Sequence, residues 1–310
     1  MARRISFLNF KGGVGKTSII VNVAAILAKQ GKRVLIVDCD PQSNSSIWLL
    51  KLDRWNELQT DRSDQTLLSV LRPNGVPAAH AIFRDAVLNS EGQPALPGLD
   101  IIPASFSLME IEHEVEDDPE NPCYARFYEQ IMSVEQEYDY IFFDCPPNLF
   151  KTTQCALFAS EDIYAPANPD ALSIIGFHLL VNKFLLFSMD AEQFRNALGA
   201  DLAQVRGVIL NGVKTGVNFS APKQRLEIMI ERFVSKRLVS DDAGIFDAEI
   251  RHTVHAGRLV SQGMPAILSR DTDVITGVLT DYKRITELIA TERTQMADIN
   301  VAVETAENAK

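Results

Sequence analysis

A glycine-rich octapeptide between two regular patterns carries the clearest chemistry in the sequence. KGGVGKTS, residues 11–18, follows an apolar run over residues 5–10 and leads into helical spacing over residues 17–30. Glycines let backbone N–H groups turn inward and approach a triphosphate closely, and the start of a helix adds its positive end to that anion site. We therefore predict a P-loop that binds ATP, in which Lys16 reaches the β- and γ-phosphates and Thr17 binds Mg²⁺. The predicted nucleotide ligands are Lys11, Gly12, Gly13, Val14, Gly15, Lys16, Thr17 and Ser18.

The octapeptide departs from the ordinary P-loop pattern at its start. That pattern has a glycine five residues before the Gly15 position, where this chain has Phe10. A second lysine, Lys11, stands at the entrance of the loop instead.

Two acidic segments follow apolar runs farther along the chain. Asp38-Cys39-Asp40 ends the run over residues 33–38, and Asp144 ends the run over residues 140–143. Ligand sites in parallel sheets lie at the carboxyl ends of the strands, so both segments should converge with the P-loop at one edge. We expect Asp144 to hold Mg²⁺ through water and Asp40 to orient the attacking water, with Thr17 as the third residue near the metal.

The apolar runs and helical spacings also predict the elements that position these residues. Strands are expected at 5–10, 33–38, 99–104, 140–144, 162–167, 205–211 and 245–250, and helices at 17–30, 65–71, 171–188, 221–237 and 272–292, with an irregular stretch over 50–97. Strands that alternate with helices predict an α/β fold: a single P-loop NTPase domain with a mostly parallel twisted sheet flanked by helices on both faces. No linker divides the chain, so we expect one domain over residues 1–296 and a polar tail over residues 297–310.

Composition places the chain among globular proteins. It has 310 residues, 46% of them hydrophobic and 23% charged, enough to bury a large core. Apolar runs fall short of the roughly 18 residues that a spanning helix requires, and no signal peptide precedes the first strand, which predicts a cytoplasmic protein. The cysteines form no CxxC pair and have no His-rich metal-binding spacing around them. We therefore predict buried free thiols at Cys39, Cys123, Cys145 and Cys155.

Charge is unevenly distributed along the chain. The net charge of -11 argues against nucleic acid as a partner, but residues 203–284 hold twelve Lys and Arg against nine Asp and Glu. A local basic surface is therefore compatible with the negative net charge of the whole chain.

Five segments together resemble a known family. They are KGGVGKTS at 11–18, DCDPQSN at 38–44, GLDIIPAS at 98–105, YDYIFFDCPP at 138–147 and IRHTVHAGRLVSQGMP at 250–265. The sequence resembles the ParA/MinD family of deviant Walker-type ATPases over nearly the whole chain, most closely the Soj-like ParA branch that partitions plasmids and chromosomes.

The resemblance implies a Mg²⁺-dependent ATPase that works as a homodimer. ATP closes a sandwich dimer in which Lys11 touches the nucleotide of the other subunit, and hydrolysis separates the subunits. Lys11, Lys16 and Asp40 would then be catalytic, and Asn211 would hydrogen-bond the adenine. A ParB-like adaptor protein would stimulate hydrolysis.

The resemblance also implies that the ATP dimer binds duplex DNA without sequence preference and is nucleoid-associated. The family's usual basic motifs are shifted or replaced by histidine near residues 250–258. The candidate DNA contacts are Arg251, Arg258, Lys223, Arg225, Lys236 and Arg237.

Other functions on this scaffold differ in features that the sequence displays. A membrane-bound relative should end in a basic amphipathic helix, which residues 291–310 do not encode, so no membrane partner is expected. A nitrogenase-reductase role needs paired cluster cysteines, whereas Cys39 and Cys145 lie inside the nucleotide motifs. Two alternatives stay open: positioning of a protein cargo such as an organelle or a chemoreceptor array, and an ATP-dependent metabolic synthetase.

Overall fold

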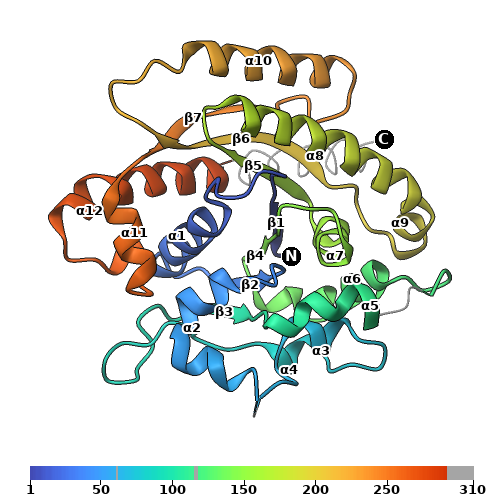
Figure 1. Cartoon of the computed structure of the whole chain (residues 1–310). Helices are drawn as coiled ribbons and strands as arrows, with labels where there is room; N and C mark the ends of the chain where they lie inside the picture. Colours follow the sequence, from blue (N-terminus) through green and yellow to red (C-terminus); the bar gives the residue numbers. More distant parts are fainter. Residues whose placement is uncertain (61, 115–117, 292–310) are drawn as a thin grey trace, which may run out of the picture.

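Seven parallel strands form the centre of the molecule (Figure 1). The computed structural model describes residues 1–60, 62–114 and 118–291. The strand order is β3-β2-β4-β1-β5-β6-β7, and every pairing between neighbouring strands is parallel. The strands are β1 (Arg3–Phe7), β2 (Val34–Asp38), β3 (Leu99–Ile102), β4 (Tyr140–Asp144), β5 (Asp162–Ala167), β6 (Gln204–Val213) and β7 (Gly244–Arg251).

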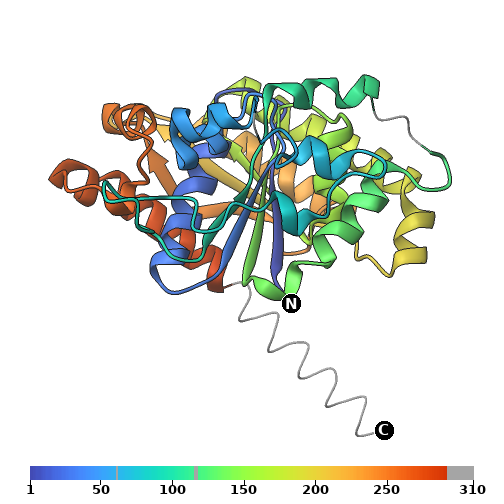
Figure 2. The ribbon, with the colours of Figure 1, turned by 90° about the horizontal axis from the view of Figure 1, so that it is seen from below.

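Helices cover both faces of this sheet, as Figure 2 shows from below. One face carries α1 (Lys16–Lys29), α2 (Asn44–Glu57), α11 (Val254–Ser261), the 3₁₀ turn Ala266–Leu268, α12 (Thr272–Thr276) and a further helical segment over residues 278–291. The other face carries α3 (Leu67–Leu71), α4 (Ala78–Ala81), α5 (Ile111–Glu114), α6 (Cys123–Met132), α7 (Lys151–Ala159), α8 (Ala171–Asp190), α9 (Glu192–Leu198) and α10 (Ser220–Ser235), with short 3₁₀ turns at Phe106–Glu110 and Glu135–Glu137. The predicted fold class is confirmed.

Side-chain alternation along the strands divides the core into two layers. In β4, Ile141 and Phe143 pack into the layer that holds α8 and α10, whereas Tyr140 and Phe142 pack into the layer that holds α1. All five residues of β4 are buried, which explains why this strand has a continuous apolar run instead of an apolar and polar alternation.

The structure corrects several predicted boundaries. Most of α2 falls where an irregular stretch was expected, because its polar start gives little helical periodicity. The last predicted helix is interrupted at Gly277, whose ψ of -102° leaves the helical region. β1 ends at Phe7, three residues early, and the Asn9 side chain then donates to the Pro166 carbonyl at 2.9 Å.

One helix in the described part of the chain, α8, is long and apolar enough by composition to cross a membrane. Half of the apolar window is buried inside the protein, where Phe177 and Leu180 pack against the sheet. The same test is passed by core helices of soluble proteins, and α8 occupies such a core position. All four cysteines are free and buried, as the sequence predicts.

Candidate active site

The P-loop lies between β1 and α1 and adopts a conformation that only glycine permits without strain. Gly13 and Gly15 have φ of +74° and +88°, in the left-handed region. Asn211, on β6, donates from Nδ2 to the Val14 carbonyl at 2.9 Å. A Cβ on Gly15 would stand 2.0 Å from that same nitrogen. The loop is therefore held from behind by a strand almost two hundred residues away in sequence.

A cavity of about 510 Å³ opens in front of this loop. The P-loop lines one side of it, and Asp40 lines another from the segment that follows β2. An apolar wall formed by Ile47, Trp48 and Val260 completes it, and these residues gave no functional signal in the sequence. The full lining is Gly12, Gly13, Gly15, Lys16, Thr17, Ser18, Asp40, Gln42, Asn44, Ile47, Trp48, Pro147 and Val260.

Beneath the loop lies a buried carboxyl group whose hydrogen-bonding capacity is unused. Asp144 is 1% exposed, and neither of its carboxylate oxygens has a hydrogen-bond partner among the described residues. Burial, together with the charge of Asp38, raises the pKa of Asp144 to about 8, and the Thr17 hydroxyl and Lys16 oppose the shift. Buried carboxylates are normally paired or bound to a cation. Asp144 and Thr17 therefore fit a divalent cation.

Lys16 lies in the same charged cluster. Its side chain is almost fully buried, and burial lowers the pKa of the ammonium, while Asp144, Asp40 and Cys145 act in the opposite direction. A desolvated ammonium at the start of a helix favours an anionic ligand, because phosphate oxygens would add negative charge and hydrogen-bond acceptors beside it.

Asp38 supports the Asp40 segment from below. Its carboxylate accepts from the Ser46 N–H at 2.9 Å, from the Ser46 hydroxyl at 2.5 Å and from the Asp40 N–H at 3.2 Å. Burial raises the pKa of Asp38 to about 6, against these hydrogen bonds. Asp38 thus fixes the turn that carries Asp40 to the cavity, and Asp40 in turn accepts from the Gln42 N–H at 2.9 Å.

Lys11 is held inside its own subunit. Its ammonium forms an ion pair with Asp170, which also caps α8 by accepting from the Ser173 N–H. Although burial alone would raise the pKa of Asp170, the hydrogen bond from Lys11 brings it below its usual value. Sequence reasoning missed Asp170, yet its place between a strand and a helix start is typical of a capping residue.

Asn211 faces the P-loop backbone and does not line the cavity. Its amide N–H is engaged by Val14, so the structure assigns it a contact that sequence reasoning did not foresee. A contact with adenine stays a prediction.

The candidate DNA residues fall on both faces of the sheet. Lys223 and Arg225 lie on α10, in one helical layer, with Lys236 and Arg237 just beyond it; Arg258 is exposed on α11, in the other layer. Arg251 is engaged by Asp281 through an ion pair at 2.8 Å.

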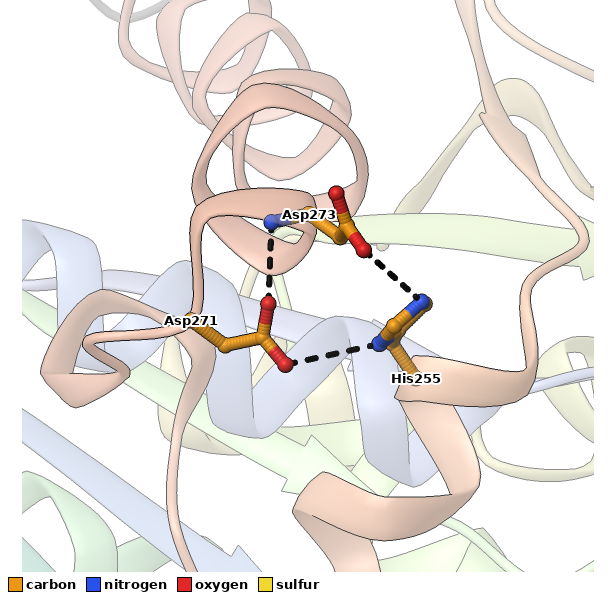
Figure 3. Close-up of side chains that lie close together, drawn as sticks. All are labelled: His255, Asp271 and Asp273. Carbon is orange, nitrogen blue, oxygen red and sulfur yellow. Dashed lines mark hydrogen bonds and ion pairs between the residues drawn. The ribbon is translucent and has the colours of Figure 1, made fainter.

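α11 is joined to the start of α12 by a histidine between two carboxylates (Figure 3). His255 Nδ1 lies 3.6 Å from Asp271 Oδ2, and Nε2 lies 3.8 Å from Asp273 Oδ2. Asp271 also accepts from the Asp273 N–H at 2.9 Å. Each ring nitrogen thus faces a different carboxylate at a distance too long for a hydrogen bond, and the same helix contributes Val260 to the cavity wall.

Comparison with known proteins gives consistent matches. The AAA domain family AAA_31 matches residues 2–196. The sporulation initiation inhibitor protein Soj of Bacillus subtilis is 30% identical over 269 residues, which cover 86% of this chain and 91% of Soj. The chromosome partitioning protein ParA of Caulobacter vibrioides is 28% identical over 266 residues, 86% of each chain. Among solved structures, an ATP complex of Cyanothece McdA(D38A) superposes with a TM-score of 0.68 at 19% identity, covering 93% of this chain and 96% of McdA.

Proposed function

We propose that this chain, which belongs to the AAA domain family matched over residues 2–196 and to the ParA/MinD family of Walker ATPases, is an ATPase. The proposed enzyme depends on Mg²⁺ and partitions DNA. Hydrolysis of ATP to ADP and phosphate would drive a cycle of dimer formation and separation. The chromosome partitioning protein ParA supports the partition role, Soj supports the family, and the McdA likeness supports the fold.

The observation that carries the ATPase proposal is the unpaired Asp144 carboxylate beneath the P-loop. A carboxyl group that is 1% exposed and has no hydrogen-bond partner among the described residues is costly to ionise, and a bound cation would stabilise its charged form. The Thr17 hydroxyl and Asp144 would hold Mg²⁺, Thr17 directly and Asp144 through water, and Asp40 stands near them at the cavity. When bound, Mg²⁺ would neutralise phosphate charge as it develops.

The chain's own residues divide the chemistry between them. The P-loop N–H groups and Lys16 bind and orient the phosphates. They would therefore stabilise the negative charge that develops on the phosphate oxygens in the transition state. Asp40, held by the turn over Asp38, is placed to orient a water molecule for attack on the γ-phosphate. Lys11 would leave Asp170 and reach the nucleotide of a second subunit in an ATP-dependent homodimer.

DNA and an adaptor complete the proposed cycle. The exposed Arg258 and the basic residues of α10 would meet the phosphates of duplex DNA without reading sequence, which would place the dimer on the nucleoid in the cytoplasm. A ParB-like adaptor would stimulate hydrolysis and release the dimer. A protein cargo, carried by the same DNA-bound ATPase, remains the second candidate function.

Two variants test the proposed division between binding and chemistry. Lys16→Ala should lose most nucleotide affinity, whereas Asp40→Ala should bind ATP and Mg²⁺ normally but hydrolyse ATP about 100-fold more slowly, because only water positioning is lost. Nucleotide binding is measured with a fluorescent ATP analogue, and hydrolysis by phosphate release with and without duplex DNA. If Asp40→Ala hydrolysed ATP at the wild-type rate, Asp40 would have no catalytic role. If the wild-type protein showed no ATP hydrolysis under any of these conditions, the ATPase proposal would fail.

A further inference from the structure

Three side chains of types that bind metal ions meet where α11 faces the start of α12 (Figure 3). One ligand atom from each of His255, Asp271 and Asp273 lies within 4.8 Å of those from the other two. None of the three lines the nucleotide cavity. The cluster is therefore separate from the magnesium site proposed at Thr17 and Asp144.

The distances within the cluster suit ligands around one ion better than hydrogen bonds. His255 Nδ1 lies 3.6 Å from Asp271, and Nε2 lies 3.8 Å from Asp273, both beyond hydrogen-bond reach. Zinc binds nitrogen and oxygen ligands at about 2.0 to 2.2 Å, so two ligands of a tetrahedral ion stand about 3.4 Å apart. The carboxylates are 43% and 74% exposed, so both side chains are able to rotate towards an ion at one ring nitrogen.

The charges and the unused hydrogen-bonding capacity of the cluster favour a cation. Among the described residues, neither Asp271 nor Asp273 forms an ion pair with a lysine or an arginine. His255 Nδ1 is buried and has no hydrogen-bond partner in the described part of the chain. Buried polar atoms are normally hydrogen-bonded, so an unpartnered ring nitrogen beside two carboxylates points to a positively charged ligand.

We propose that His255, Asp271 and Asp273 bind a divalent transition-metal ion such as Zn²⁺. An imidazole nitrogen favours such an ion over Mg²⁺, which takes oxygen ligands. His255 Nδ1 is the nitrogen that the ion would satisfy, and one oxygen from each aspartate would complete a set of three protein ligands. Water would occupy the remaining position, because Asp273 leaves the cluster open to solvent.

Backbone hydrogen bonds already hold both sides of the proposed site. The Thr253 hydroxyl accepts from the His255 N–H at 3.2 Å, and the Asp271 carboxylate accepts from the Asp273 N–H at 2.9 Å. The three ligands therefore stand at the first turns of two helices, and a bound ion would cross-link these turns. Because Val260 of α11 lines the nucleotide cavity, the ion would also fix that part of the cavity wall.

Calorimetric titration of the nucleotide-free full-length protein with Zn²⁺ tests the site. His255→Ala and Asp273→Asn should each weaken the binding of one Zn²⁺ by about 100-fold, because each removes a ligand. His252→Ala removes an exposed histidine outside the cluster and is the matched control for the first variant. Asp247→Asn removes an exposed carboxylate on β7 and is the control for the second. Both controls should bind Zn²⁺ as the wild type does.

Hydrogen–deuterium exchange supplies a structural readout of the same site. Zn²⁺ should slow exchange of the amides of residues 258–264 about 10-fold in the wild type, because the ion binds only when α11 and α12 are in place. Asp273→Asn should lose this effect of Zn²⁺. Without Zn²⁺, exchange in Asp273→Asn should equal that of the wild type, which separates loss of a ligand from damage to the fold.

Three outcomes would overturn the proposal. Absence of Zn²⁺ binding by the wild type would show that the cluster holds no ion. Equal affinity in the wild type, His255→Ala and Asp273→Asn would place the bound ion elsewhere. Equal weakening by His252→Ala would show an adventitious ion only, held by surface histidines. Neither readout uses ATP, and every variant keeps the P-loop and its acidic residues, so the result is independent of the proposed function.

Discussion

At the scale of single residues, the site is built around charges that the isolated protein leaves incompletely balanced. Among the described residues Asp144 is buried without a hydrogen-bond partner, Lys16 is buried with a lowered pKa, and Lys11 is paired with Asp170 outside the cavity. A magnesium nucleotide would add negative charge beside Lys16 and a cation beside Asp144, and a second subunit would offer Lys11 an alternative partner to Asp170. The nucleotide-free protein is therefore expected to be less stable than its loaded form.

The ion pair between Lys11 and Asp170 predicts opposite effects of two substitutions on dimer formation. Lys11→Ala should bind ATP but remain monomeric, because it removes the contact across the interface. Asp170→Asn keeps a side chain able to cap α8 but weakens the hold on Lys11, so it should dimerise at an ATP concentration several-fold lower than the wild type requires. Light scattering during an ATP titration measures both. Normal dimerisation of Lys11→Ala would exclude Lys11 from the interface.

Asp144 predicts a pH dependence of stability in the absence of metal and nucleotide. Its pKa is about 8 in the folded protein, against 3.8 for a free aspartate side chain, so the folded protein binds the extra proton between these values. Its contribution to stability is full below pH 3.8 and is lost as pH rises towards 8, at up to about 1.4 kcal/mol per pH unit. Asp38, with a pKa of about 6, acts in the same direction over the lower part of that window.

Urea unfolding at pH 5, 6.5 and 8 tests this dependence. Asp144→Asn cannot titrate, so its free energy of unfolding should fall less between pH 5 and 8 than that of the wild type, and the variant should be the more stable protein at pH 8. Identical slopes for the two proteins would show that Asp144 is ionised in the folded state throughout this range.

At the scale of elements, the P-loop is held by neighbours that come from distant parts of the sequence. β6 contributes Asn211 behind Gly15, and α8 packs against the entrance of the loop at Gly176. Asn9 links the two sides, since its Oδ1 accepts from the Lys11 N–H at 2.9 Å and its Nδ2 donates to the carbonyl of Pro166 on β5. The loop conformation is therefore a property of three strands and two helices.

Gly176 offers a test of this coupling between α8 and the loop. A Cβ at this position would stand 2.2 Å from Asn9 Oδ1 and 3.2 Å from the Lys11 amide nitrogen. Gly176→Ala should therefore destabilise the protein by about 2 kcal/mol and weaken nucleotide binding by about 10-fold, through displacement of Asn9. Gly257→Ala on α11, where a Cβ meets nothing within 4 Å, is the matched control: it should leave nucleotide affinity unchanged and should not destabilise the protein. Equal nucleotide affinity in both variants would contradict the coupling.

At the scale of the whole molecule, the acidic chain must meet DNA through a limited surface. The net charge is -11, and the basic candidates lie on or near α10 and α11, which belong to opposite helical layers. Because Arg251 is engaged by Asp281, Arg258 is the more available of the two arginines near α11. Two-fold symmetry in a dimer would duplicate every contact.

The salt dependence of DNA binding measures these contacts directly. Each phosphate that the protein neutralises contributes a slope of about -0.9 to log K against log salt, so Arg258→Ala, present twice in a dimer, should flatten the slope by about two. Arg251→Ala should change it less, because its partner Asp281 already neutralises it. Fluorescence anisotropy with unrelated duplexes and ATP gives the slopes. If the wild type did not bind DNA at low salt with ATP, a nucleoid-bound function would be excluded and the ATP-dependent metabolic synthetase would be favoured.

The sequence by itself determined the sheet, the P-loop and the acidic residues at the strand ends, because these depend on local patterns. Apolar runs marked all seven strands, and KGGVGKTS has few other physical explanations. The tertiary structure alone decided which distant groups meet: Asn211 with Val14, Lys11 with Asp170, and the cavity wall of Trp48 with Val260. These pairs join different strands and helices, and no periodicity within one segment encodes which element packs beside it.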